Sequence, residues 1–209
     1  MTVDSVAEVA PAALPALDDA GRAILFTAAR TANSFAPTPV TDAELESVWE
    51  LAKWPPTAAN VQPLRVLYVR TPEGRERLVR HMSDGNKAKT ASAPAVAVLA
   101  VDTQFHEHIP QVLPFRPELR DVFAADDTMR TETMRFSGAL QAGYFLLAVR
   151  AQGLAAGPMG GFDREGLDAE FFPDGRWKSV LVVNIGHPGT DPWFGRLPRL
   201  DHASVIQWA

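Results

Sequence analysis

The pattern of hydrophobic and polar residues predicts helices and strands in turn along the chain. In segment 41–54 the apolar residues recur at helical spacing, and Thr41 with Glu44 forms the pattern of a capping box. Pro55 and Pro56 end this helix because proline cannot continue it. The same criteria predict further helices over 18–35, 71–82, 131–153 and 163–172, and strands over 64–70, 93–101 and 177–186.

Three segments shape the expected architecture. The helix over 131–153 is apolar on most sides, so we expect it at the centre of the protein, with Gly153 as its C′ residue. Residues 105–126 contain three prolines and predict an irregular excursion that forms a lid or an exposed subdomain. The tail over 193–209 is apolar without a helical pattern, so it must pack on something, and one candidate is a second subunit. The order of elements predicts an α+β fold with a central mixed sheet flanked by helices.

Composition narrows the class of protein. The chain has 209 residues, of which 46% are hydrophobic, and this suits one domain over 21–209 after a flexible lead-in over 1–20. A formal net charge of −5 argues against a nucleic-acid partner. No apolar run approaches the ~20 residues of a membrane span, and the first residues lack the early Lys or Arg of a secretory signal. We therefore expect a cytoplasmic protein.

The sequence offers no side chain with an obvious catalytic setting. There is no cysteine, which excludes disulfides, thiolate metal sites and a cysteine nucleophile. His106 and His108 lack an evident third ligand, so no metal site is expected. Ser92 and Ser137 lack a nucleophile elbow, and the segment GPMGGF lacks both a P-loop lysine and a dinucleotide fingerprint. We therefore predict no catalytic residue, and chemistry that resides on a bound cofactor.

Five short segments suit such a cofactor. Scattered Arg, Lys and Asn residues beside a glycine-rich edge are typical of sites for a phosphate and a flat heterocycle. Each segment alone has an ordinary explanation as a surface charge or a turn, and their combination carries the prediction. The segments are ARTANSF (29–35), PTAAN (56–60), GNKAKT (85–90), GPMGGF (157–162) and GRLPRL (195–200).

In this order the chain resembles the FMN-dependent nitroreductase superfamily, from about residue 22 to 200. The resemblance rests on ARTANSF, PTAANVQPL, NKAK, GPMGGFD and RLPR. Within that superfamily the chain is most similar to the malonic semialdehyde reductases that form 3-hydroxypropionate. The resemblance implies a nitroreductase-like fold, FMN as cofactor and NAD(P)H as co-substrate. It also implies a homodimer with FMN at the interface and a C-terminal arm that wraps the partner.

The resemblance also implies a role for each matched residue. The phosphate, the ribityl chain and the flavin pyrimidine would be held by Arg30, Thr31 and Asn33, and the ring would be lined by Pro56, Thr57, Ala58 and Asn60. Asn86 and Lys89 would face the pyrimidine oxygens and N1, and the segment of Met159, Gly160 and Gly161 would turn a backbone N–H toward N5. Arg196 would bind the phosphate of the FMN held mostly by the other subunit. The chain departs from the common pattern at three of its positions, with Asn33 for a basic residue, Gly160 for an acidic one and Leu64 for Trp.

Several functions are compatible with these residues. The first is a reductase that passes hydride from NAD(P)H to 3-oxopropanoate, with Arg116, Arg120 and Arg135 as candidate carboxylate ligands. The second is a nitroaromatic or quinone reductase with stacking from Phe105, Phe115 or Phe123. The third is a flavin-binding protein without turnover, and the fourth is a structural domain without a cofactor.

Overall fold

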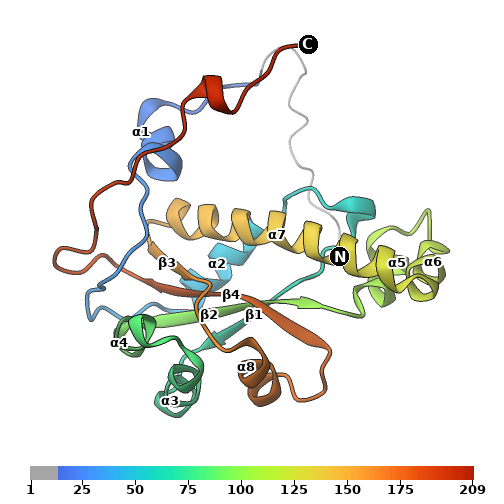
Figure 1. The fold of residues 1–209 in the computed structure, drawn as a ribbon, viewed down its shortest axis with the longest axis horizontal. Helices are drawn as coiled ribbons and strands as arrows, with labels where there is room; N and C mark the ends of the chain where they lie inside the picture. The colour runs from blue at the N-terminus through green and yellow to red at the C-terminus, as the bar shows by residue number, and fades with distance from the viewer. Residues whose placement is uncertain (1–13) are drawn as a thin grey trace.

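A four-stranded antiparallel sheet forms the centre of the protein (Figure 1). The structure is a computed structural model that describes residues 14–209, so most of the predicted lead-in lies outside the described residues. The strand order is β1–β2–β4–β3, with bounds β1 Leu64–Val69, β2 Ala95–Asp102, β3 Ala155–Met159 and β4 Trp177–Gly186. Every neighbouring pair among these strands is antiparallel, so the prediction of a mixed sheet is wrong for the described residues. The reason is physical: side-chain alternation reveals burial and carries no information about strand direction.

Helices cover both faces of the sheet and give the predicted α+β architecture. On one face α2 (Asp42–Ala52) and α7 (Asp127–Ala151) pack against the sheet. On the other face lie α3 (Pro72–His81), α4 (Asp84–Ser92) and α8 (Arg164–Phe171), as Figure 1 shows. The central strand β2 is buried along its whole length, so its apolar residues join the two layers into one core.

The local signals at element ends are confirmed. Thr41 and Glu44 form a complete capping box at the start of α2. Pro72 lies in the first turn of α3, where its missing N–H costs no hydrogen bond. Gly153 has φ +74° just beyond α7, a conformation that glycine adopts without a steric penalty.

The predicted helix over 18–35 is mostly wrong. Only α1 (Asp19–Arg22) and a π-helical turn, Ala23–Thr27, form there. Beyond this turn the chain bonds to other segments instead: the Ala32 N–H donates to the Ala156 carbonyl at 2.9 Å. Ile24 and Phe26 are exposed, so the helix has no core in the described chain that would extend it.

The excursion over 105–126 is more regular than its prolines suggest. It contains a 3₁₀ turn (Phe105–His108), α5 (Ile109–Val112) and α6 (Leu119–Ala125). Proline is tolerated in the first turn of a helix, which is where Pro110 lies. Outside this excursion, α4 and β3 were missed; β3 accepts Pro158 because it is an edge strand with one neighbour.

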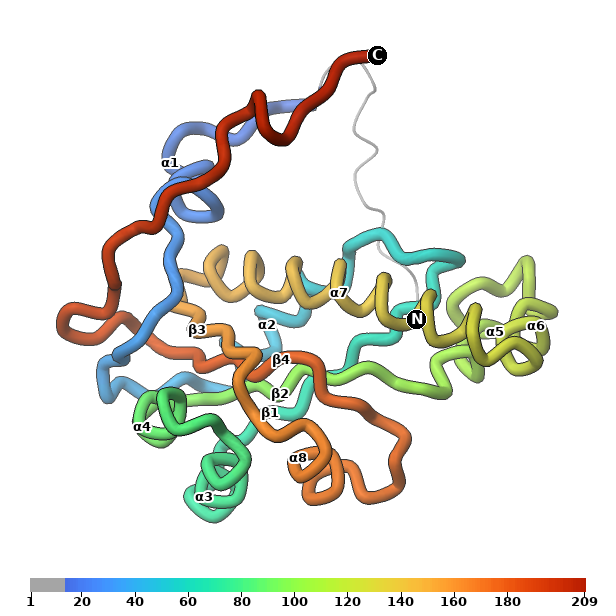
Figure 2. The backbone as a smooth tube through the Cα atoms, in the orientation of Figure 1, coloured from blue at the N-terminus to red at the C-terminus, as the bar shows by residue number. Residues whose placement is uncertain are grey.

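The long helix α7 buries only one of its faces. Phe136, Leu140 and Tyr144 follow one another at four-residue spacing and are exposed, so the prediction of a fully central helix is wrong. The tail, with a single 3₁₀ turn (His202–Ser204), projects with α1 away from the core (Figure 2). In residues 14–209 no helix has both the length and the apolar character that crossing a membrane requires.

Candidate functional site

A cationic cavity lies where the segment after α1 meets the tail. Arg30 donates to the Phe194 carbonyl at 3.3 Å, and Arg196 donates to the Ala29 carbonyl at 3.0 Å. The cavity of about 220 Å³ is lined by Ala29, Arg30, Thr31, Asn33, Phe194, Gly195, Arg196, Leu197 and Arg199. Within the described chain none of its three arginines forms an ion pair with a carboxylate, so the cavity carries uncompensated positive charge suited to an anion.

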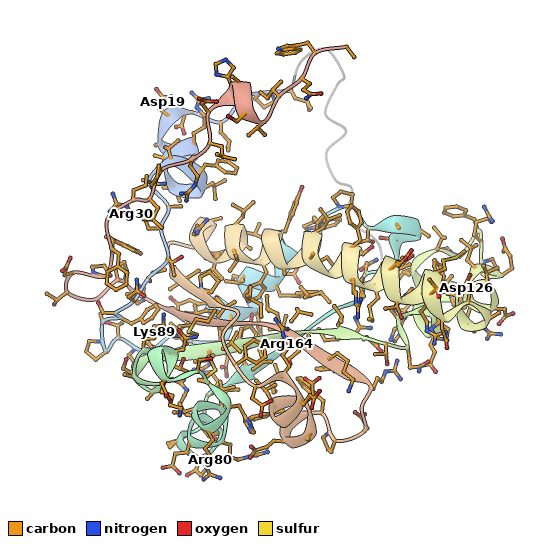
Figure 3. The ribbon with its side chains drawn as sticks, in the orientation of Figure 1. Asp19, Arg30, Arg80, Lys89, Asp126 and Arg164 are labelled. Carbon is orange, nitrogen blue, oxygen red and sulfur yellow. The ribbon has the colours of Figure 1, made fainter. Side chains whose placement is uncertain are left out.

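Helix α4 connects this cavity to the glycine-rich end of β3. Asn86 and Lys89 lie three residues apart, on one side of the helix. The Asn86 amide donates to the Gly161 carbonyl at 2.9 Å, and Lys89 Nζ donates to Asn33 Oδ1 at 3.4 Å. Figure 3 shows Lys89 and Arg30 on the same side of the molecule. The structure therefore brings the predicted segments around residues 30, 86 and 160 together.

The two glycines at the end of β3 differ in their surroundings. A Cβ on Gly161 would lie 3.0 Å from Asn86 Nδ2 and 3.1 Å from Ser83 Oγ, so a larger residue there would have to displace these side chains. A Cβ on Gly160 would meet nothing within 4 Å. Because Gly160 faces open space, a planar ligand can approach its backbone closely.

The predicted turn over 56–60 has an unusual backbone. Ala59, Asn60 and Gln62 all have positive φ, at 49°, 52° and 43°, a region that costs an L-residue about 1–2 kcal/mol. Asn60 Nδ2 donates to the Val112 carbonyl at 2.8 Å, while Gln62 Nε2 donates to Asn60 Oδ1 at 2.9 Å. The Asn60 side chain therefore ties the turn to α5.

This turn lies beside the middle of α7, whereas the cationic cavity lies near the C-terminal end of the same helix. The Ala58 N–H donates to Ser137 Oγ at 3.4 Å, whereas Ala151 and Arg30 line one cavity near the end of the helix. A rise of 1.5 Å per residue separates Ser137 from Ala151 by roughly 20 Å. A single chain therefore holds the predicted site residues in two halves that do not meet.

A buried ionic network supports the turn half. Asp102 is 1% exposed and accepts hydrogen bonds from Arg65 at 2.8 Å and from Arg176 at 3.0 Å. Arg65 also donates to the Gln62 carbonyl at 3.0 Å, so the network reaches the turn. Burial alone would raise the pKa of Asp102, but the hydrogen bonds from Arg176 and the Gln104 N–H and the charge of Arg65 lower it below its usual value.

Part of the excursion belongs to the core and not to an open pocket. Phe105 and Phe123 are buried, with ring centroids 5.3 Å apart, and only Phe115 remains exposed. Arg116 pairs with Glu118, and Arg120 pairs with Asp121 at 2.8 Å. Arg135 is exposed and has no ion pair within residues 14–209.

The two histidines of this excursion are not arranged as metal ligands within the described residues. His106 is buried beside the Phe105 ring, and burial together with the charge of Arg130 lowers its pKa. His108 Nε2 lies 3.8 Å from Asp102 Oδ2. In the described residues no three His, Asp or Glu side chains gather closely enough to hold a metal ion.

The sequence analysis did not identify two buried polar residues that lie beside the cationic half of the candidate site. Thr90 directly follows Lys89 and is 0% exposed. Asn184 lies in β4, is 0% exposed, and interrupts the otherwise apolar run VLVVNI. A polar residue inside an apolar strand is the signal that could have identified it.

The protein is thus an α+β domain whose predicted site residues fall into two groups that do not meet within one chain. The sequence profile of the Nitroreductase family matches residues 27–187, and the chain belongs to that family. The nitroreductase-like fold implied by the five segments is thereby confirmed.

Relatives and solved structures agree with this assignment. The chain is 61% identical over 196 residues to a Streptomyces coelicolor protein named "Putative NADH dehydrogenase/NAD(P)H nitroreductase", covering 94% of this chain and 97% of that one. It is 50% identical to a Streptomyces griseus protein of the same name, covering 91% and 96%. A nitroreductase structure in complex with FMN from Exiguobacterium sibiricum matches with a TM-score of 0.81 at 18% identity, over 94% of this chain and 99% of that one.

Proposed function

We propose that the protein is an FMN-dependent NAD(P)H oxidoreductase. One observation carries this proposal: α4 ties the Arg30–Asn33 segment to the Met159–Gly161 segment, so that cations, amides and bare backbone converge at one edge of the sheet. This is the donor set that a phosphate, a flavin pyrimidine and flavin N5 require. The names of the two Streptomyces relatives and the FMN bound in the Exiguobacterium structure support it.

The residues fit FMN on structural grounds. The arginines around the cavity lack carboxylate partners in the described chain, so a phosphate would neutralise them. The open space over Gly160 leaves room for a planar ring against the backbone. Arg30, Thr31 and Arg196 would hold the phosphate end, and Asn86 and Lys89 would face the ring.

Bound FMN would supply the redox chemistry by accepting a hydride from NAD(P)H and passing it to a second substrate. The side chains bind and orient, and none of them needs to act as an acid or a base. Lys89 would place a positive charge beside the ring and so would favour its reduced, anionic form. The backbone of Gly160 and Gly161 would offer an N–H to N5 at a fixed height, because Gly161 is held by Asn86.

We infer a homodimer from the separation of the two halves. A two-fold axis across the exposed face of α7 would bring the 56–60 turn of one copy to the cationic half of the other. The face offers Phe136, Leu140 and Tyr144, and an exposed apolar stripe of this kind marks an interaction surface. In the dimer that stripe is buried and both ligand sites are complete.

The tail supports the same dimer. Leu197, Leu200 and Trp208 are 75%, 77% and 91% exposed, so the tail lacks a partner within the described chain. Beside the free edge of β1 lies a largely apolar groove of about 590 Å³ that includes Glu46 and Glu50. We propose that the arm of the second copy wraps this side, with its exposed apolar residues packed in the groove.

For the substrate we propose 3-oxopropanoate, reduced to 3-hydroxypropanoate in the cytoplasm, where NAD(P)H is available. Among the three candidate arginines, Arg116 and Arg120 already pair with carboxylates. Arg135 has a free guanidinium within the described chain and is the best ligand for the substrate carboxylate. The competing nitroaromatic or quinone substrate would stack on exposed Phe115, since Phe105 and Phe123 are committed to the core.

An anaerobic absorbance spectrum before and after addition of NADPH tests the proposal. A flavin band that bleaches supports the reductase. A band that persists favours a flavin-binding protein without turnover, and a protein that takes up no FMN refutes the cofactor. Comparison of kcat/KM for the semialdehyde and for a nitroaromatic then separates the substrates, and loss of the semialdehyde rate in Arg135→Gln with an unchanged nitroaromatic rate would identify the carboxylate ligand.

A further inference from the structure

A buried polar cluster lies directly beneath the proposed flavin-facing segment. Thr90 Oγ1 lies 3.7 Å from the sulfur of Met159, and Asn184 Nδ2 lies 3.8 Å from the same sulfur. The three side chains are 0%, 4% and 0% exposed, in the order Thr90, Met159, Asn184. Two donors from different elements therefore converge on one thioether, which is a weak acceptor.

This arrangement is costly and has no evident structural purpose. The surrounding core contains apolar side chains such as Val96, Val98 and Val182, and valine has nearly the shape of threonine. Asn184 Oδ1 is buried and has no hydrogen-bond partner in the described chain. An unsatisfied buried polar group costs about 1–3 kcal/mol, so an apolar residue at position 184 would stabilise the fold at least as well. The Thr90 hydroxyl has only the weak thioether acceptor in return for its burial, so the same expectation holds for valine at position 90.

The cluster is the second of two connections between α4 and the 159–161 segment. At one point Asn86 Nδ2 and the Ser83 N–H both donate to the Gly161 carbonyl, at 2.9 and 3.1 Å. At the other point Thr90 reaches the Met159 sulfur. Asn86 and Thr90 lie four residues apart on one face of α4, and Lys89 lies between them in sequence.

We propose that Thr90 and Asn184 are positioning residues of the flavin site. Through the Met159 sulfur they fix the side chain that anchors the 159–161 backbone, and so they set the distance between the Gly160–Gly161 amides and the ring. The distance of an N–H from N5 affects the oxidised and the reduced ring differently, so the cluster sets the reduction potential. This inference rests on the proposed function and adds a determinant of the FMN reduction potential that acts through Met159.

The test uses Thr90→Val and Asn184→Leu in the full-length protein. Each variant should shift the equilibrium between oxidised and reduced FMN by about three- to tenfold, where tenfold corresponds to about 30 mV for two electrons. The melting temperature should stay equal or rise, because an apolar side chain replaces a poorly satisfied polar one. Thr90→Ser, which keeps the hydroxyl, should retain the wild-type potential.

A second readout needs no flavin. In the FMN-free protein, hydrogen exchange at the amides of residues 159–161 should accelerate several-fold in both variants. Ser179→Ala is the matched control: it removes a buried hydroxyl that has no hydrogen-bond partner in the described chain, from the same strand as Asn184 and roughly 17 Å away. Its exchange rate and potential should match the wild type.

A double variant tests whether Thr90 acts on the 159–161 segment through the Met159 sulfur. In a Met159→Leu background, Thr90→Val should cause no further shift in potential or exchange. Unchanged exchange and potential in both single variants would overturn the inference, as would fully additive effects with Met159→Leu. If the wild-type protein binds no FMN, the proposed function fails, and the exchange experiment still reports whether the cluster positions the segment.

Discussion

The two halves of the candidate site are built in opposite ways. The half around Arg30, Lys89 and Gly160 holds cations and amides that long-range hydrogen bonds align across three elements. The half at 56–60 is uncharged and owes its shape to a strained backbone with positive φ. One half thus offers charge and the other offers an uncharged surface.

We expect the largest effect from a charge on the exposed face of α7, because it would separate the two copies whose halves form one site in the proposed dimer. In Phe136→Glu a carboxylate would be buried in each copy across the two-fold axis, at a cost of several kcal/mol per charge. We expect the dissociation constant of the dimer to rise by roughly 1,000-fold or more and FMN binding to fall with it. Sedimentation and FMN titration measure the two effects.

Phe115→Glu is the control for that experiment. Phe115 is 78% exposed and Phe136 is 68% exposed, but Phe115 lies on the excursion and not on α7. The control should remain dimeric and retain FMN. A dimer that survives Phe136→Glu would contradict the proposed interface.

The turn half alone is tested by removing the charge of Asp102. Asp102→Asn leaves Arg65 and Arg176 without their buried partner, and we expect a loss of about 3 kcal/mol in the free energy of unfolding at pH 7. The folded state lowers the pKa of Asp102, so its contribution exists above the pKa of the unfolded carboxyl and disappears as pH falls below about 4. Denaturation at pH 7 and pH 3 should therefore show a difference that shrinks in acid.

The cationic half alone is tested at Lys89. Lys89→Ala removes a charge-assisted contact of about 1.5–3 kcal/mol, so the FMN dissociation constant should rise roughly 10- to 100-fold and reduction by NADPH should slow. Lys87→Ala is the matched control, because Lys87 pairs with Asp84 on the same helix at 2.7 Å. Unchanged FMN affinity and reduction rate in Lys89→Ala would remove this residue from the site.

The smallest effect concerns the strain in the turn. Ala59 has φ 49° and ψ 30°, and glycine tolerates this conformation without the clash of a Cβ. Ala59→Gly should raise the free energy of unfolding by about 0.5–1 kcal/mol. A loss of stability in thermal or urea denaturation would show that the turn is not strained.

The sequence predicted those features that depend on neighbouring residues. The capping box at Thr41, the C′ glycine at Gly153 and the buried strand β2 follow from short-range rules and are confirmed. The strand β3 was missed because Gly157 and Pro158 are poor strand formers, and their pairing with β4 depends on tertiary contacts. The exposed face of α7 was missed because composition does not show which apolar residues of a helix stay outside the core of the chain.

The candidate site shows the same division between features that residue types reveal and features that depend on tertiary contacts. The segments around Arg30, Asn86 and Gly160 were identified from residue types and are brought together by the fold. Their roles toward FMN remain predictions. Thr90 and Asn184 were missed because their importance arises from convergence on Met159, which only the three-dimensional arrangement reveals.

In the proposed dimer, the separation of the two halves along α7 has a genetic consequence. A chain with Lys89→Ala and a chain with a bulky Ala58→Trp would each form homodimers in which both sites are damaged. When the two chains are co-expressed, each mixed dimer combines both defects in one site and leaves the other site intact. Random pairing would thus restore about a quarter of all sites, and two defective alleles would complement each other.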